Sequence, residues 1–393
     1  MDRRDTLITL NLVPGLGPAT IHRLTEAFGS SERIFQADPA VLREILGRYA
    51  SDAVIAGIRS ALGGGPLSEE LKRVEKAGVR IVTGADPDYP RLLKSIPNPP
   101  PVLYVHGSLW EEDEAAVALV GTRRATPYGL NVARGLAQKI AEAGITVVSG
   151  LAEGIDRAGH EGALEGKGRT IAVLGHGLST LFPFHHRGLA QRIIQSGALV
   201  SEFPMEMEPL KENFPIRNRV IAGLSLGVVV VEAPLRSGAL ITAREALEQG
   251  REVFAVPGPV SSPQSKGTHQ LLRDGARLLE GVADLFEELA PALKERVSRF
   301  HDVSSFPPSI PPFGGTVEGR RKRESSEDDV LKWGLSPEES QLYQTIPVAT
   351  GVMMEALAHQ APLPPSRLLS ALTTLELKGL VRQVPGQGYT RVE

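Results

Sequence analysis

The spacing of apolar residues divides the chain into three parts. From about residue 102 to 288, short apolar runs bounded by glycine alternate with amphipathic stretches. We predict strands at residues 116–120, 145–148, 170–174, 198–201, 227–232 and 252–256. Continuous apolar strands separated by helices are typical of a parallel sheet that is covered on both faces. Right-handed crossovers then predict a Rossmann-like, doubly wound, mostly parallel α/β domain over residues 71–290.

The first 70 residues show helical spacing instead. An apolar stripe is interrupted at residues 13–18 and resumes at Ile21. Helix, glycine hairpin and helix is the pattern of a helix-hairpin-helix (SAM-like) domain, in which hairpin amides can face a phosphate. A plain turn between two helices, with Gly15 and Gly17 present for positive φ, fits the same residues. We therefore predict a helical domain over residues 1–70.

The sequence of the last hundred residues predicts a linker followed by a small domain. Residues 291–335 contain a proline-rich run and charge blocks, which predict a disordered linker. Residues 336–393 show three helical segments and then a two-stranded hairpin, the pattern of a winged helix. Its presumed recognition helix carries few basic residues, so protein contact and DNA contact both remain open.

Composition and charge exclude several classes of protein. The chain of 393 residues has no cysteine, which excludes thiolate catalysis, disulfides and cysteine-bound metals. A formal charge of -3, from 43 basic and 46 acidic residues, excludes a uniformly basic nucleic-acid binder. Residues 1–25 contain no signal peptide, and no apolar run reaches the ~18 residues of a membrane span. We expect a cytoplasmic protein that does not contact a membrane.

The candidate binding site lies where the strands end. Ligands of a doubly wound sheet bind beyond the carboxyl ends of its strands, and here those loops combine glycines, hydroxyls and arginines, which suit phosphate oxygens. Phe184, Phe214 and the His185–His186 pair offer flat faces on which unpaired bases can stack. The candidate residues are Gly121, Thr122, Arg123, Arg124, Ser149, Gly150, Phe184, His185, Arg217, Asn218, Arg219, Ser237, Gly238, Lys266, Gly267 and Thr268.

Each candidate also has a purely structural explanation. The glycines can form ordinary strand-to-helix turns. Arg217 and Arg219 can pair internally, and the candidate partners are Glu202 and Glu232. The adjacent His185 and His186 can form a metal pair, but the sequence offers no evident third ligand.

The chain lacks the motifs of the common α/β enzymes. There is no G-x-G-x-x-G after the first strand, no G-x-x-x-x-G-K-[ST] and no G-x-S-x-G. A dinucleotide oxidoreductase, a P-loop ATPase and an α/β-hydrolase all lose support. Because no nucleophile–base pair is evident either, we expect no catalytic residue, no cofactor and no bound metal.

Several separated blocks carry a resemblance to a known family. The blocks are residues 121–123, 149–156, 214–219, 232–243 and 256–258. In this order they resemble the bacterial DNA-processing protein family called DprA or Smf, over roughly residues 85–290. The flanking helical and winged-helix segments also fit members of that family.

The resemblance implies a protein that is not an enzyme. Members bind single-stranded DNA entering the cell in natural transformation and load the RecA recombinase onto it. Their Rossmann-like domains form a homodimer that aligns two strand-binding pockets, and duplex DNA binding through a flanking domain remains open. The pocket residues carried over are Gly121, Thr122, Arg123, Ser149, Gly150, Arg217, Asn218, Arg219, Ser237, Gly238, Gly267 and Thr268.

The chain departs from the family in one loop. Family members often place lysine or arginine after the proline of the Phe182-Pro183 loop, where this chain has Phe184 and then His185. Stacking by Phe184, or a pH-dependent contact by His185, is the expected substitute.

Related enzymes suggest an alternative function. Phosphoribohydrolases of this fold type carry a Pro-Gly-Gly-x-Gly-Thr-x-x-Glu block with a catalytic glutamate. The equivalent residues here, 234–242, lack that block. A nucleotide-processing enzyme is therefore the alternative to a strand-binding protein.

Overall fold

The computed structural model forms two compact units, residues 1–315 and 316–393. The residues that it describes are 2–29, 31–61, 64–297 and, in the second unit, 342, 343, 345, 346, 357, 372, 375, 380–384 and 388–391. Among these residues, no helix is long and apolar enough to span a lipid bilayer.

The first unit begins with short helices. They are α1 (Arg3–Asn11), α2 (Pro18–Phe28), α3 (Ser31–Gln36), α4 (Pro39–Leu46), α5 (Asp52–Ser60) and α6 (Gly65–Lys76), with a 3₁₀ turn at Gly47–Tyr49. In the turn between α1 and α2 only Gly15 has a positive φ, of 85°. Gly17 has a φ of -92° and is the N-cap of α2, where Pro18 follows as the first helical residue. The two glycines therefore have different roles.

One mixed sheet runs through the rest of this unit. Its strands are β1 (Arg80–Thr83), β2 (Val102–Gly107), β3 (Ala116–Val120), β4 (Thr146–Ser149), β5 (Thr170–Leu174), β6 (Ala198–Ser201), β7 (Gly227–Val230), β8 (Glu252–Ala255) and β9 (Arg277–Leu278). The strand order is β1-β2-β6-β5-β4-β3-β7-β8-β9. All neighbours from β6 to β9 are parallel, whereas β1 and β2 extend the sheet antiparallel. This confirms the doubly wound, mostly parallel prediction.

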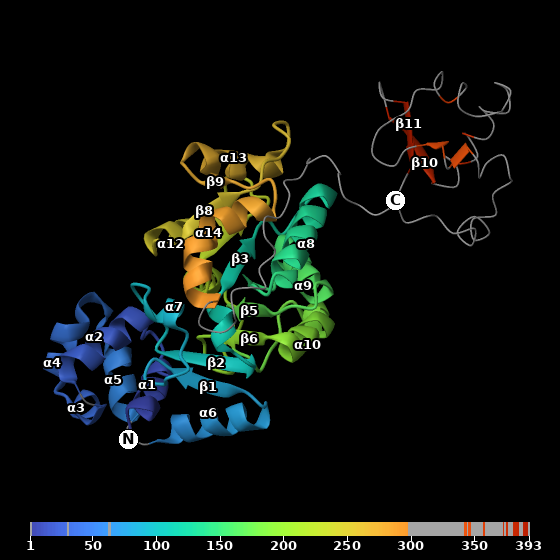
Figure 1. Cartoon of the computed structure of the whole chain (residues 1–393). Helices are drawn as coiled ribbons and strands as arrows, with labels where there is room; N and C mark the ends of the chain where they lie inside the picture. The colour runs from blue at the N-terminus through green and yellow to red at the C-terminus, as the bar shows by residue number, and fades with distance from the viewer. Residues whose placement is uncertain are drawn as a thin grey trace. The chain divides into compact units, whose positions relative to one another are not determined.

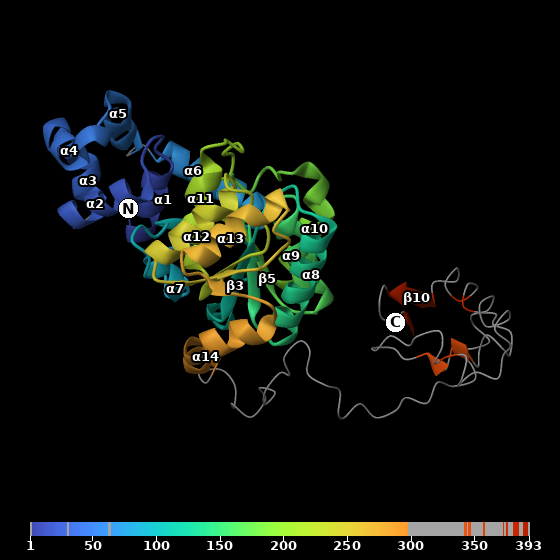
Figure 2. The same cartoon turned by 90° about the horizontal axis from the view of Figure 1, so that it is seen from above.

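Helices cover both faces of the sheet. They are α7 (Arg91–Lys94), α8 (Pro127–Glu142), α9 (Ile155–Glu165), α10 (Arg187–Ser196), α11 (Asn213–Gly223), α12 (Gly238–Glu248), α13 (Lys266–Arg273) and α14 (Val282–Val297), with 3₁₀ turns at Glu111–Glu114, Phe184–His186 and Pro263–Ser265. Helices α8, α9 and α10 lie on one side of the strands, and α11 and α12 lie on the other (Figure 2).

Strand β3 shows why both faces are covered. Alternate side chains of a strand point to opposite faces. Ala118 belongs to the apolar cluster formed with α11 and α12, whereas Leu119 belongs to the cluster formed with α8, α9 and α14. Every residue of β3 is buried. The apolar run that predicted this strand is therefore the signature of its central position.

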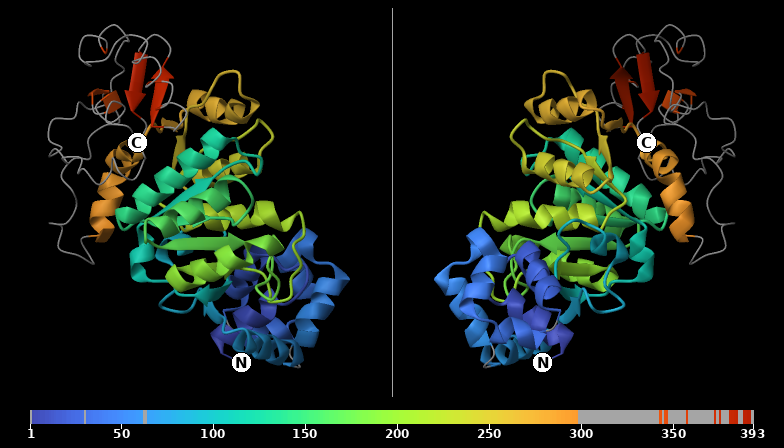
Figure 3. Two further views of the ribbon diagram at one scale, coloured as in Figure 1. Left: turned by 90° about the vertical axis from the view of Figure 1, so that its right-hand side faces the viewer. Right: turned by 90° about the vertical axis from the view of Figure 1, so that its left-hand side faces the viewer.

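The N-terminal helices share a core with the antiparallel end of the sheet. Leu10, Ile21 and Leu46 belong to the same buried cluster as Ile81 of β1 and Tyr104 of β2. Figure 1 shows these helices beside β1 and β2, and both views of Figure 3 place them at the opposite end of the sheet from α13.

Helix α14 alters the expected start of the linker. It continues to Val297, although we expected the linker to begin at residue 291. The remainder of the predicted linker, residues 298–335, lies outside the described residues.

The second unit contains the predicted hairpin. Strands β10 (Val381–Val384) and β11 (Gly388–Arg391) pair antiparallel. Val381 and Tyr389 of the hairpin are buried in one cluster with helical residues that include Leu342, Leu357 and Leu375. The bounds of the three predicted helices fall on residues that are not described.

Candidate functional site

A cavity of about 690 Å³ opens at the carboxyl edge of the sheet, around the ends of β3 and β7. The chain leaves β3 toward β4 on one side, and β7 lies on the other side, so this is the point where the strand order reverses. Ligands of doubly wound folds bind at such a point. Its wall includes the loops after β3, β4 and β7 and the first turns of α11 and α12.

Half of the predicted site residues line this cavity. They are Gly121, Thr122, Arg123, Arg124, Arg217, Asn218, Ser237 and Gly238. The cavity is also lined by Ala152, Asp156, Phe182, Lys211, Phe214, Arg236 and Thr242, together with apolar and proline residues.

The turn after β3 requires glycine. A Cβ atom on Gly121 would lie 2.5 Å from the Ile155 side chain and 2.9 Å from the carbonyl oxygen of Glu232. The amide of the next residue, Thr122, donates to that carbonyl oxygen at 2.7 Å. The chain thus turns tightly against β7, and Arg123 and Arg124 follow with exposed side chains.

Two aromatic rings form part of the wall. The rings of Phe182 and Phe214 have centroids 6.3 Å apart and are tilted by 48°. The guanidinium carbon of Arg123 lies 5.4 Å from the centre of the Phe214 ring, within the range of a cation–π contact. Of the two phenylalanines that we predicted as stacking residues, Phe214 lines the cavity, whereas Phe184 is 72% exposed and does not. Phe182, two residues earlier, takes that position.

Arg217 is buried, and it donates to two backbone oxygens and, from Nε, to Oδ1 of Asn218 at 3.2 Å. Its Nη1 donates to the carbonyl oxygen of Gly150 at 2.9 Å and to that of Val173. Burial lowers the pKa of Arg217 to about 10, while the opposite charge of Asp156 raises it. The guanidinium therefore remains charged at neutral pH. It contributes a fixed positive charge to the cavity wall and holds the loop after β4.

Asp156 is the acidic residue of the lining. It lies in the first turn of α9. Its Oδ2 accepts hydrogen bonds from the amides of Gly150 at 3.2 Å and Ala152 at 3.4 Å. Burial raises the pKa of this carboxyl, and the charge of Arg217 opposes that effect. Through these hydrogen bonds, Asp156 stabilises the loop after β4.

Helix α12 points its N-terminus at the cavity. Ser237 is its N-cap and accepts from the amide of Ala239 at 3.3 Å, while Asn218 donates to the carbonyl oxygen of Gly238 at 3.3 Å. Amides of a first helical turn and the helix dipole both favour an anion there.

Basic residues outnumber acidic ones around the cavity. Its lining contains five basic residues, Arg123, Arg124, Lys211, Arg217 and Arg236, against the single acidic Asp156. All but Arg217 are exposed. This local excess contrasts with the net charge of -3 for the whole chain.

Sequence reasoning missed two of these cations. Arg236 directly precedes the N-cap Ser237 in the loop after β7, so its place before a helix at the carboxyl edge was a usable signal. Lys211 lies between β6 and α11, in a segment without regular structure. Its approach to the cavity depends on the path of that loop, which no local pattern shows.

Two predicted residues lie beneath the cavity rather than in its wall. The Ser149 hydroxyl is fully buried and donates to the carbonyl oxygen of Leu119 at 2.6 Å. A Cβ atom on Gly150 would come within 2.6 Å of the Arg217 guanidinium, so glycine makes room for that side chain.

Arg219 is paired internally, as the structural explanation proposed. It forms an ion pair with Glu202 and donates to the carbonyl oxygen of Asn98 at 2.8 Å. Its side chain is 11% exposed and does not line the cavity. Arg217, in contrast, is held by backbone oxygens rather than by a glutamate.

The predicted residues after β8 and β5 also fall outside the cavity wall. Lys266 donates to the carbonyl oxygen of Val260 at 2.7 Å, the Gly267 amide donates to that of Ala233 at 2.7 Å, and Thr268 is fully buried. His185 is exposed beside Glu153.

Comparisons with known proteins show which family this chain resembles over its length. Residues 80–290 match the family model described as DNA recombination-mediator protein A, and residues 329–387 match the DprA winged helix domain. Protein Smf of Synechocystis is 34% identical over 96% of this chain and 96% of its own length. The DNA processing protein DprA of Bacillus subtilis is 42% identical over 57% of this chain and 75% of its own.

A solved structure is also similar. The X-ray structure of DNA processing protein A from Streptococcus pneumoniae matches with a TM-score of 0.65 at 34% identity. The match covers 73% of this chain and 99% of that one. The winged-helix match agrees with the helical residues and the hairpin of the second unit.

Proposed function

The chain belongs to the DNA recombination-mediator protein A family, and we propose that it binds single-stranded DNA in the cavity around the ends of β3 and β7. The observation that carries the proposal is the excess of basic residues there, five against one, on a chain of net charge -3. Such a local excess favours a polyanion at this edge of the sheet.

The aromatic pair favours a single strand over a duplex. Base–aromatic stacking needs an unpaired base, because the faces of paired bases are occupied by their neighbours in the stack. Phe182 and Phe214 lie in the same wall as the exposed arginines, so one nucleotide can contact both a ring and a cation. Stacking and phosphate contacts tolerate any base, and we infer binding without strong sequence preference.

We infer a binding role rather than catalysis. Among the residues that line the cavity, Asp156 is the acid, and it accepts hydrogen bonds from two backbone amides. No glutamate is present in the lining, so the catalytic glutamate of the phosphoribohydrolase block has no counterpart in it. Incubation with nucleoside monophosphates tests the alternative: we expect no release of free base, and release would favour the enzyme.

Two further proposals concern the transfer of the bound strand and the assembly of the chain. We propose that the bound strand is passed to the RecA recombinase and that the chain acts as a homodimer. A mediator of recombination needs a recombinase as its recipient, and two pockets in one assembly hold one strand more tightly than either alone. RecA filament formation on single strands should start sooner when the chain is present, and an unchanged start would contradict the transfer.

One titration tests the strand-binding proposal. Labelled oligothymidine and a matched duplex are titrated with the full chain at several salt concentrations. We expect the single strand to bind more tightly, with a slope of log affinity against log salt of about -0.7 for each phosphate neutralised. The four exposed basic residues of the lining then predict a slope of about -3 for one occupied pocket. A flat salt dependence, or tighter binding of the duplex, would contradict the proposal.

A further inference from the structure

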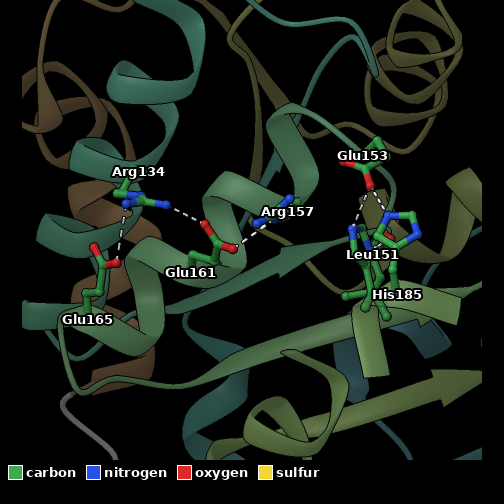
Figure 4. Close-up of polar contacts among 8 residues, drawn as sticks. Arg134, Leu151, Glu153, Arg157, Glu161, Glu165 and His185 are labelled. Carbon is green, nitrogen blue, oxygen red and sulfur yellow. Dashed lines mark hydrogen bonds and ion pairs between the residues drawn. The ribbon is translucent and has the colours of Figure 1, made fainter. Parts of the chain in front are cut away.

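Three side chains with metal-binding atoms meet outside the cavity wall. Glu153 comes from the loop between β4 and α9, and His185 comes from the 3₁₀ turn before α10 (Figure 4). His186 is the next residue of that turn. One ligand atom from each lies within 4.8 Å of the others. Glu153 is the third ligand that the sequence did not reveal, because 32 residues separate it from His185.

Hydrogen bonding fixes the orientation of His186. Its Nδ1 lies 3.0 Å from the carbonyl oxygen of Leu151, and its ring is 2% exposed. A carbonyl oxygen only accepts, so Nδ1 carries the hydrogen and Nε2 is the atom with the free lone pair. A backbone carbonyl that holds one ring nitrogen while the other faces outward is the arrangement found behind metal-bound histidines.

The free nitrogen of His186 faces a carboxylate. Its Nε2 lies 3.1 Å from Oε1 of Glu153, and the Nε2 of His185 meets the same oxygen. In neutral His186 these are two acceptors directed at each other, which is unfavourable unless a proton or a cation lies between them. The His185 ring packs edge-on against the His186 ring, with centroids 4.6 Å apart, so both nitrogens converge on one point.

Arg157, which follows Glu153 by four residues, pairs with another carboxylate. Arg157, one turn along α9, donates from Nε to Glu161 at 2.9 Å, and Arg134 also pairs with Glu161 (Figure 4). The Glu153 carboxylate is therefore directed at the two histidines.

We propose that Glu153, His185 and His186 bind a divalent transition-metal ion of the zinc class. Two imidazole nitrogens and one carboxylate oxygen form a donor set that zinc accepts, with metal–ligand distances of about 2.0–2.2 Å and a fourth position open to water. Tetrahedral bonds of that length place ligand atoms about 3.3 Å apart, close to the 3.1 Å between Glu153 and His186. His185 is 61% exposed and can rotate to the same spacing.

The ion would join two loops at the cavity. Glu153 adjoins Ala152, and the 3₁₀ turn follows Phe182 by two residues; both Ala152 and Phe182 line the cavity. Metal binding there fixes the loop after β4 to the loop after β5. The proposal is independent of DNA binding, because its test uses no nucleic acid.

Zinc titration of the full chain provides the test. The protein is prepared without an affinity tag, freed of metal by a chelator, and titrated with zinc by calorimetry and against a chromogenic chelator. We expect one high-affinity equivalent per chain and a higher melting temperature with zinc, since a ligand that binds the folded state stabilises it. Cobalt in place of zinc should give the visible absorption of a low-symmetry, nitrogen- and oxygen-ligated ion.

Substitution of two proposed ligands, with one control variant, tests the site. Glu153→Gln and His185→Ala should each weaken zinc binding at least tenfold, with circular dichroism as a check on folding. His22→Ala is the control, because His22 and Glu26 form an exposed pair 3.3 Å apart, outside the one three-ligand group found among the described residues. This control should bind zinc like the parent chain. Absence of a zinc equivalent in the parent, or unchanged binding in both ligand variants, would overturn the proposal.

Discussion

Arg123 and Arg217 line the same cavity but have opposite environments. Arg217 donates to backbone oxygens and is 5% exposed, whereas Arg123 is exposed and contacts only the Phe214 ring among the described partners. A phosphate can therefore reach the Arg123 guanidinium without breaking any existing hydrogen bond. This difference makes Arg123 the main phosphate contact that we propose.

Replacement of Arg123 tests that assignment. Arg123→Ala should weaken single-strand binding by roughly 1.5–3 kcal/mol, the size of a charge-assisted hydrogen bond. Fluorescence anisotropy with labelled oligothymidine measures the loss. Arg192→Ala on α10 is the control, because Arg192 is also exposed but does not line the cavity. Equal affinity of the two variants would refute the role of Arg123.

His160 makes stability depend on pH. It is fully buried on α9, and Nδ1 lies 2.7 Å from the Thr170 hydroxyl, which itself donates to Val147. Nδ1 must therefore donate, and Nε2 is left buried without a partner. Burial lowers the pKa of His160 to about 3. Protonation would place a charge and an unsatisfied N–H in the core.

The sign of the pH effect follows from this shift. The unfolded chain takes up the proton below about pH 6.5, and the folded chain does so only near pH 3. Stability is full above pH 6.5 and falls below it, by up to about 1.4 kcal/mol per pH unit for this group. His160→Gln should melt with a shallower dependence between pH 7 and 5 than the parent, while His22→Gln should not. Parallel curves for parent and His160→Gln would contradict the argument.

At the scale of elements, the loop between β4 and α9 depends on Gly154. Its φ is 80° with ψ at -123°, a region that only glycine adopts readily. A Cβ atom there would lie 2.3 Å from the carbonyl oxygen of Thr122 and 2.8 Å from that of Arg123. Any larger residue must therefore push the loop after β3 away from its place in the cavity wall.

A matched pair of glycine variants tests this dependence. Gly154→Ala should lower the free energy of unfolding by at least about 2 kcal/mol and weaken strand binding as well. Gly135→Ala lies inside α8, where an added Cβ meets nothing within 4 Å. It should raise stability by about 0.5–1 kcal/mol. Chemical denaturation measures the free energy of unfolding of both variants. An unchanged free energy of unfolding in Gly154→Ala would contradict the packing argument.

The sequence predicted the central parallel strands well and missed the edge strand β9. The six predicted strands correspond to β3–β8, because each is an apolar run buried on both faces. Strand β9 escaped prediction because both of its residues are exposed.

The predicted site residues and the cavity lining differ in the loops after β5 and β8. The predicted residues in the loops after β3 and β7 line the cavity. After β5, Phe182 lines it but the predicted Phe184 and His185 do not, and none of the predicted residues after β8 lines it. Local sequence shows that a loop follows a strand, but not which of its side chains turn toward the cavity. It therefore cannot separate Phe182, which lines the cavity, from Phe184, which does not.

At the scale of the molecule, β9 offers a surface for self-association. It is the last strand of the sheet, and Leu278 on it is 48% exposed, whereas the adjacent Leu279 is buried in the core. An edge strand presents unpaired backbone groups to another chain. We propose this edge as the dimer contact of the first unit.

The length of the DNA single strand provides a test of the dimer. If two pockets act together, oligonucleotides that span both should bind much more tightly than short ones. Leu278→Arg should abolish this dependence on length and leave short-strand binding unchanged. Leu247→Arg, an exposed site on α12, is the control. Sedimentation that shows only a 42.1 kDa monomer, with or without DNA, would overturn the dimer.

The core shared by the N-terminal helices and β1–β2 sets how this unit can be divided. Met205 donates its amide to Glu70 of α6 at 2.7 Å, and both residues are buried. A fragment that starts at residue 85 would lack β1 and expose the apolar face of β2, including Tyr104. We expect it to aggregate, whereas residues 1–297 should melt in one calorimetric transition with equal van't Hoff and calorimetric enthalpies. Two separate transitions would show that the helices fold alone. With one transition, helices and sheet are a single cooperative unit that proteolysis cannot trim without loss of solubility.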